Sequence, residues 1–422
     1  MRERVERLLN QDAGLAADLA QGIATQQCSV ESTASVLYAL YTSLVYLTPV
    51  LGGWVADRYL GQKKSVYVGA ILMALGQFVL FGADSLFFIA LLLLIIGSGL
   101  FKPALPTQVG SLYAPEDARR DGAFAIFYMG VYLGTFLCTF VCGLLAAHYG
   151  WRYGFLAAGV GMCIGLLVQF LGRNHLAPDA LQERKAGGTQ VVEKQPLTPG
   201  EWKRVWALGV LCLLNVAFWA VYEQRNTTLQ MWVEERSESA GGASWEGLFS
   251  VSPIFFFALV PLLDRFWAWQ NQRGRAPFSV AKMAMGCFIL LLSILLMVLG
   301  TSLLGEGAGG LLWALVCTVL MTIGEIYVFS GSLSLVTRVA PVRIVSLMVG
   351  VWFLSTFVGT LLAGLGIQVY WRMSPESFFP LLLGLGIAVG VGIWLFNKPL
   401  RKGVMPPDHP PRVASAEGST AS

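Results

Sequence analysis

Charged residues are scarce in this sequence. Asp, Glu, Lys and Arg make up 13% of its 422 residues, whereas soluble domains carry about 25%. Hydrophobic residues make up 55%, and they fall in many runs of about 20 residues, the length that crosses a bilayer. Because an open strand cannot satisfy its backbone in lipid, these runs are expected to be helices. The composition excludes an ordinary soluble domain and predicts an all-α integral membrane protein.

Histidine and cysteine are also few. None of the three histidines lies in the middle of an apolar run, and the seven cysteines are scattered, mostly within such runs. Cys138 and Cys142 are one helical turn apart but lack His or acidic neighbours, so we interpret them as small hydrophobic residues. We therefore expect no metal site, no cofactor and no enzyme activity. Residues 1–30 lack the apolar core that a cleavable signal peptide needs.

Eleven apolar segments predict eleven clear transmembrane helices. The polar loop 172–204 divides them into a first bundle of five at 33–171 and a second bundle of six at 205–398. Residues 399–422 are rich in Pro, Ser and Ala and are expected to form a disordered tail. The eleven segments cover 33–56, 65–83, 86–112, 121–147, 152–171, 205–232, 246–269, 280–303, 309–337, 344–370 and 377–397.

The basic residues are distributed unevenly between the loops. Alternate loops, beginning with 57–64 and including 172–204 and the tail, hold 21 of the 29 Lys and Arg residues. Since cytoplasmic loops are enriched in basic residues, these loops and the C-terminus are predicted to be cytoplasmic. The net charge of +4 arises mainly between apolar runs, so it does not indicate a nucleic-acid partner.

A short motif occurs once in each half of the chain. An acid–arginine–aromatic turn begins at Asp57, after the first apolar segment, and at Asp264, after the seventh. If the two halves correspond, the segment 205–232 has no partner in the first half. Residues 1–32 occupy the expected place, but they are too polar for an ordinary spanning helix. The sequence therefore predicts a degenerate or missing first helix.

Three ionisable residues lie deep within apolar segments: Lys102, Glu223 and Glu325. Each is about 24–27 Å along its helix at 1.5 Å per residue, and a charge at that depth normally faces a water-filled cavity. Pro103 can kink its helix, which is tolerated beside a cavity. Two other interpretations stay open: Glu223 near the outer interface, or a structural ion pair between Lys102 and Glu325. A polar pocket between two helical halves is typical of a secondary transporter.

Four stretches of sequence match a known family. They read LYTSLVYLTPVLGGWVADRYLG (40–61), FKPALPTQVGSLYAPEDARRDGAFAIFYMGVYLG (101–134), FWAVYEQ (218–224) and GEIYVFSGSLSLVTRVAPVRIVSLMVGVWFLS (324–355). The chain resembles the proton-dependent oligopeptide transporters of the major facilitator superfamily over about residues 35–398. The resemblance implies that superfamily's two-bundle fold and a monomer in a bacterial-type inner membrane. It also implies proton-coupled uptake of di- and tripeptides by alternating access.

The resemblance also implies roles for individual residues. Lys102 and Glu325 are similar to family residues that bind the two termini of a peptide and take part in coupling. Glu223 resembles the family's proton-coupling glutamate, and the turn of Asp57 and Arg58 matches a conformational latch. The other implied substrate-binding residues are Tyr41, Tyr132, Trp219, Ser252 and Trp352.

Two pocket positions depart from the family pattern. Tyr132 stands where the family has a cavity asparagine, and Ser252 replaces the asparagine of an Asn-Pro pair. Both changes remodel the pocket, so a second hypothesis is a transporter of the same superfamily that carries a different solute or drug.

The N-terminus departs further from the family. Glu3, Glu6 and Arg7 reproduce the start of the family's first helix, but the aromatic residues and the second arginine that follow there are missing. In the family that arginine partners the seventh-helix glutamate, which is Glu223 here. A third hypothesis is therefore a sensor or remnant that binds peptides but cannot couple their transport to protons.

Overall fold

The structure is a computed structural model of the whole chain. Regular structure in the part of the chain that it describes is helical, with no strand. No cis peptide bond occurs in that part. The described residues are 37–38, 40–114, 117, 119–179, 181, 197–226, 252–273, 277–303, 310–370, 372–373 and 375–403.

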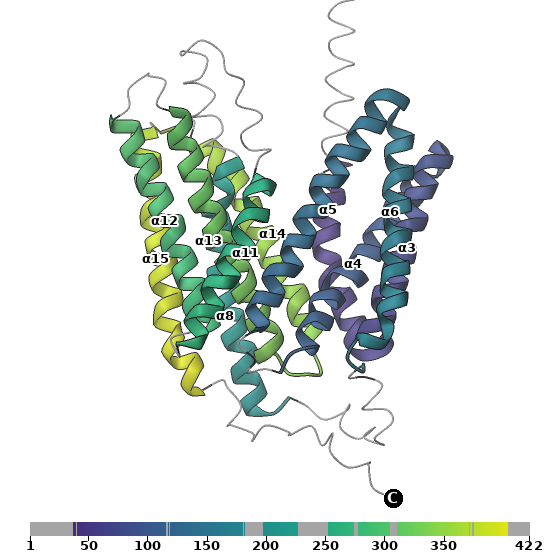
Figure 1. Ribbon diagram of the computed structural model, residues 1–422, viewed down its shortest axis with the longest axis horizontal. Helices are drawn as coiled ribbons and strands as arrows, with labels where there is room; N and C mark the ends of the chain where they lie inside the picture. Colours follow the sequence, from purple (N-terminus) through teal and green to yellow (C-terminus); the bar gives the residue numbers. More distant parts are fainter. Residues whose placement is uncertain are drawn as a thin grey trace, which may run out of the picture.

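The helices form two bundles that follow the order of the chain (Figure 1). The N-terminal bundle begins with the helical residues 40–55 and a π-helical turn. The remaining elements of this bundle are η1 (Ala56–Leu60), α3 (Gln62–Gly82), α4 (Phe87–Ser111), α5 (Arg120–Tyr149) and α6 (Trp151–Leu171). The C-terminal bundle contains α8 (Pro199–Tyr222), α11 (Ser252–Gln272), α12 (Ser279–Leu303), α13 (Gly310–Val339), α14 (Val345–Tyr370) and α15 (Pro375–Gly403).

Within the described residues, nine helices are long and apolar enough to cross a membrane. This confirms the all-α membrane fold that the composition predicts, because each of these helices satisfies its own backbone in lipid. The predicted total of eleven stays a prediction, since parts of the expected segments lie outside the described residues.

Two helices of the C-terminal bundle extend beyond their predicted bounds. Helix α8 begins at Pro199, before the predicted residue 205, because Thr198 and Glu201 form a capping box that satisfies the first backbone donors. Helix α15 continues to Gly403, so the first residues of the predicted tail are helical. Apolar runs mark where a helix can enter lipid, but not how far it continues into water.

The two bundles use the same packing device at equivalent helices. Gly69 of α3 faces Gly97 of α4, and Gly286 of α12 faces Gly324 of α13. A Cβ atom at any of these positions would lie 2.7–2.8 Å from the backbone oxygen of the facing glycine. Small residues allow such close helix contact in membranes. The shared device supports the internal repeat predicted from the motifs at Asp57 and Asp264.

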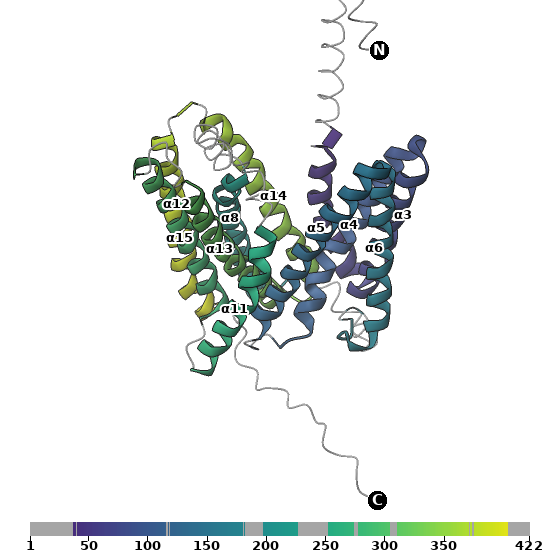
Figure 2. The same cartoon turned by 45° about the horizontal axis from the view of Figure 1, so that its top comes forward.

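The bundles approach each other at one end. In Figures 1 and 2 the ribbons lie close together at the lower end and diverge towards the upper end. Helices α5, α8, α12 and α14 all begin at this lower end, which also carries the turn η1. The lower end is the one that the distribution of basic residues predicts to be cytoplasmic.

Candidate functional site

Glu325 of α13 lies where the two bundles meet. It is 2% exposed, and its Oε1 accepts hydrogen bonds from two hydroxyls of α5, Tyr128 at 2.8 Å and Tyr132 at 2.6 Å. The hydroxyl of Tyr222, the last residue of α8, donates to Oε2. A carboxylate removed from water is costly unless donors satisfy it. Three tyrosines, two of them from the opposite bundle, therefore hold this acidic group.

Ring stacking fixes the tyrosines of α5. Tyr128 stacks on Phe329 of α13 with ring centroids 3.4 Å apart, and Tyr132 stacks on Phe256 of α11 at 4.1 Å. The two tyrosines are one helical turn apart, so their side chains leave the same face of α5. Both hydroxyls are thereby held in position around Glu325.

Lys102 approaches an aromatic ring instead of a carboxylate. Its Nζ lies 4.4 Å from the ring centroid of Tyr46, and that ring stacks on Phe357 of α14 with centroids 5.3 Å apart. Within the described part of the chain, no ion pair joins Lys102 to Glu325. A structural ion pair between these two residues is thus not formed in this conformation. Lys102 sits on the proline-containing stretch of α4, where Thr107 donates to the carbonyl of Pro103 at 2.8 Å.

Glu223 lies at the end of its helix, not deep within it. Helix α8 ends at Tyr222, and Glu223 begins the 3-10 turn η5 (Glu223–Asn226). The predicted segment 205–232 thus changes from α to 3-10 geometry at this residue, and its last six residues lie outside the described part of the chain. The alternative that places Glu223 near the outer interface stays open. Glu223 is half-buried and interacts electrostatically with Tyr46. Tyr222, the preceding residue, contacts Glu325, and Tyr46 contacts Lys102. These two tyrosines therefore connect Glu223 to the other two charged residues.

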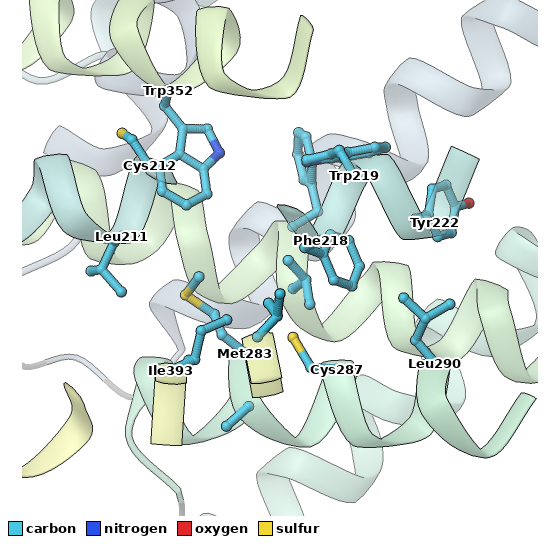
Figure 3. Close-up of a cluster of buried hydrophobic side chains, with 14 of the residues drawn as sticks. Leu211, Cys212, Phe218, Trp219, Tyr222, Met283, Cys287, Leu290, Trp352 and Ile393 are labelled. Carbon is cyan, nitrogen blue, oxygen red and sulfur yellow. The ribbon is translucent and has the colours of Figure 1, made fainter. Parts of the chain in front are cut away.

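The two predicted tryptophans are buried along α8 (Figure 3). Trp219 is 6% exposed and packs edge-on against Tyr222, with centroids 5.2 Å apart. Trp352 of α14 is 2% exposed. It lies beside Cys212 of α8, nearer the beginning of α8 than Trp219. Both tryptophans belong to one buried apolar cluster, and Trp219 in addition contacts the Glu325 site through Tyr222.

Of the other predicted pocket residues, the structure describes the side chain of Tyr41, which lies in a different cluster from Glu325. Tyr41 packs against a separate apolar cluster of α3 and α4 that contains Leu80 and Leu94. Ser252 begins α11, but its side chain lies outside the described part of the structure. The same is true of the whole of Glu3, Glu6 and Arg7.

The Asp57 turn connects the bundles at the lower end. The carboxylate of Asp57 accepts backbone hydrogen bonds from Ser346 at 3.1 Å and Leu347 at 2.9 Å, in the first turn of α14. A negative charge at a helix N-terminus is favourable, because the unpaired N–H groups and the helix dipole face it. Arg58 is exposed and stays on its own turn, 5.8 Å from the rings of Trp54 and Tyr59. The contact with the other bundle is made by Asp57.

Sequence reasoning missed three residues of this site: Tyr46, Tyr128 and Tyr222. Tyr128 precedes Tyr132 by one helical turn, and Tyr222 precedes Glu223 directly, so both positions carried a local signal. Tyr46 had none, because its partners come from α4 and α14. Among the described residues, no group of three or more His, Cys, Asp or Glu side chains could hold a metal ion.

Comparisons with known proteins agree with this architecture. The profile of the Major Facilitator Superfamily matches residues 13–364. The uncharacterized transporter YclF of Bacillus subtilis (strain 168) is 31% identical, over 89% of this chain and 87% of the relative. A di-/tripeptide transporter of Lactococcus lactis subsp. cremoris is 28% identical, over 88% and 87% of the two chains.

Solved structures of the same kind match most of the chain. A POT family transporter in complex with a thioalcohol-conjugated peptide is 25% identical, covers 86% of this chain and 87% of its own, and has a TM-score of 0.61. Another, in complex with 5-aminolevulinic acid, has the same identity and coverage and a TM-score of 0.60. These are transporters, not enzymes. The chain belongs to the major facilitator superfamily and, within it, to the proton-dependent oligopeptide transporters.

Proposed function

We propose that this protein is a secondary active transporter that takes up di- and tripeptides together with protons by alternating access. The observation that carries the proposal is Glu325, a buried carboxylate held between the bundles by hydroxyls of α5 and α8. Relatives that share most of this chain are named di-/tripeptide transporters, and a related structure holds a conjugated peptide.

The charges suit the two constant ends of a peptide. The peptide ammonium binds Glu325 and replaces tyrosine hydroxyls as the donor to the carboxylate. The peptide carboxylate binds Lys102, whose ammonium contacts only the face of Tyr46 among the contacts described above. Because Lys102 belongs to the N-terminal bundle and Glu325 to the C-terminal bundle, one ligand contacts both. Binding energy is thereby available for moving the bundles.

Protons act on the same set of groups. Glu223 is the proposed proton-coupling carboxylate, with contributions from Lys102 and Glu325. Its neighbour Tyr222 donates to Glu325, so neutralising Glu223 changes the field around the substrate site. The weaker coupling candidates Glu3, Glu6 and Arg7 stay predictions. The proton gradient is the energy source, the lower end faces the cytoplasm of an inner membrane, and the transporter works as a monomer.

The test is uptake of labelled dialanine into proteoliposomes, with and without an inward proton gradient. Uptake that the gradient stimulates, and that Glu325→Gln abolishes, is the expected result. Dialanine binding without uptake would instead identify the coupling-defective sensor. Neither binding nor uptake by folded protein would favour a superfamily transporter for another solute.

A further inference from the structure

Asp121 and Lys282 form a buried ion pair between the bundles. Asp121 lies in the first turn of α5 and Lys282 in the first turn of α12. Nζ of Lys282 is 2.7 Å from Oδ2 of Asp121, and the two side chains are 5% and 8% exposed. The hydroxyl of Ser279, also in the first turn of α12, donates to Oδ1 at 3.1 Å. The pair lies at the lower end and is separate from the Glu325 site.

Neighbouring elements hold Lys282 in this position. Its Nζ is 4.4 Å from the ring centroid of Trp267 on α11. Trp267 is 5% exposed and packs edge-on against Tyr327 of α13, with centroids 5.1 Å apart. The ammonium therefore lies between an aromatic face and a carboxylate. The cation–π contact and the ion pair both stabilise its positive charge. Removing either charge of such a pair leaves the other buried without its partner, which is strongly unfavourable.

The nearby arginines are engaged elsewhere. Arg120, 2% exposed, donates to the carbonyl of Tyr113 and to the hydroxyl of Thr337, both at 2.8 Å. Arg119 pairs with Asp117 at 2.8 Å within the loop before α5, and its hydrogen bonds hold the pKa of Asp117 below the usual value. Among the contacts described here, neither arginine forms an ion pair with Asp121.

The pair complements the Asp57 contact. Asp57 attaches the N-terminal bundle to the start of α14, whereas Asp121 attaches it to the start of α12. Two attachments at different helices oppose both separation and rotation of the lower ends. Alternating access requires these ends to separate once in each cycle.

We propose that Asp121 and Lys282 are an ionic lock that holds the lower end closed and opens once per transport cycle. Ser279 is its positioning residue. The inference rests on the proposed function only in requiring alternating access, not in the identity of the substrate.

A cavity beside the lock gives the separated charges a route to water. It has a volume of about 410 Å³ and lies between the lower ends of α5 and α11. Its lining includes Lys282, Asp264, Trp267 and Asn271. As the bundles move apart, water entering this cavity can hydrate the ammonium and the carboxylate. Hydration replaces the lost ion pair and allows a buried lock to open and close repeatedly.

Hydrogen–deuterium exchange of the full chain in nanodiscs tests the lock without any substrate. In Asp121→Asn and in Lys282→Met, amides in the first turns of α5, α12 and α14 are expected to exchange faster by about tenfold or more. The charge-exchanged double variant Asp121→Lys/Lys282→Asp is expected to restore much of the protection. Ser279→Ala, which leaves both charges in place, is expected to give a smaller increase at the same amides.

Asp117→Asn is the matched control. It removes an aspartate from an ion pair in the neighbouring loop, but Arg119 in that pair is 81% exposed, and exposed pairs contribute little. Its exchange is expected to equal that of the wild type. Unchanged exchange in folded Asp121→Asn, or in Ser279→Ala if the charge variants do not fold, would overturn the lock. If dialanine uptake fails in the wild type while these changes occur, the substrate assignment is wrong and the lock stands.

Discussion

Tyr132 on α5 donates a 2.6 Å hydrogen bond to Glu325 on α13, across the boundary between the two bundles. The position where the family resemblance leads one to expect a cavity asparagine is thus occupied by a longer side chain that reaches the acidic group. In this conformation, hydroxyls of the chain itself satisfy the buried carboxylate. Under the proposed function, a substrate ammonium competes with those hydroxyls for the same oxygens.

This competition predicts tighter substrate binding when one hydroxyl is removed. In Tyr132→Phe, the ring can keep its stacking on Phe256 while Oε1 of Glu325 loses a donor. One net hydrogen bond corresponds to about 0.5–1.5 kcal/mol, so the Kd for dialanine should fall by roughly twofold to tenfold. Calorimetric titration measures it. Tyr149→Phe, at an exposed position at the end of the same helix, is the matched control and should bind as the wild type does. Weaker binding in Tyr132→Phe would mean that the hydroxyl contacts the peptide.

Lys102→Ala should abolish dialanine uptake without preventing membrane insertion or folding. The change removes the cation proposed to bind the peptide carboxylate. Among the residues that the structure describes, the lysine has no ion pair that its loss would disrupt. Uptake in proteoliposomes measures transport, and elution in size-exclusion chromatography shows whether the variant is folded. Lys203→Ala, at an exposed position of α8, provides the control. Wild-type uptake by Lys102→Ala would remove this residue from the substrate site.

Glu223→Gln should separate exchange from coupling. The glutamine side chain is neutral at all pH values and cannot carry a proton, so uptake should no longer respond to an inward proton gradient. Counterflow of labelled against unlabelled dialanine needs no net proton movement and should persist. The two assays on the same proteoliposomes give the comparison. A variant that the gradient still drives would show that protons bind elsewhere.

Substitutions of Asp57 and of Arg58 should have different effects on the contact between the Asp57 turn and α14. Asp57→Asn removes the charge from the first turn of α14, an interaction of about 0.3–2 kcal/mol. Amides of residues 346 and 347 should then exchange faster, and uptake should decrease. Arg58→Ala should leave those amides unchanged, because the guanidinium contacts only its own turn among the contacts described above. Equal effects of the two variants would contradict a latch made by Asp57.

Much of the fold could be predicted from the sequence, because the bilayer imposes simple rules. Apolar runs of spanning length predict helices, and the loops between them carry the basic residues. Depth within a run also identified Lys102 and Glu325 as unusual. The rule did not predict the change of α8 to a 3-10 turn at Glu223, because apolar composition does not define where a helix changes geometry.

By itself, therefore, the sequence determined that this chain crosses the membrane repeatedly, in two related halves, with a few charges where lipid does not tolerate them. Tertiary structure alone decided which groups meet those charges. Lys282 lies at the start of the predicted segment 280–303 and had no predicted partner, yet it lies buried against Asp121. Tyr46 carried no signal, yet its ring lies 4.4 Å from the ammonium of Lys102. The partners of a buried polar group come from distant helices, so only the packing of the bundles brings them together.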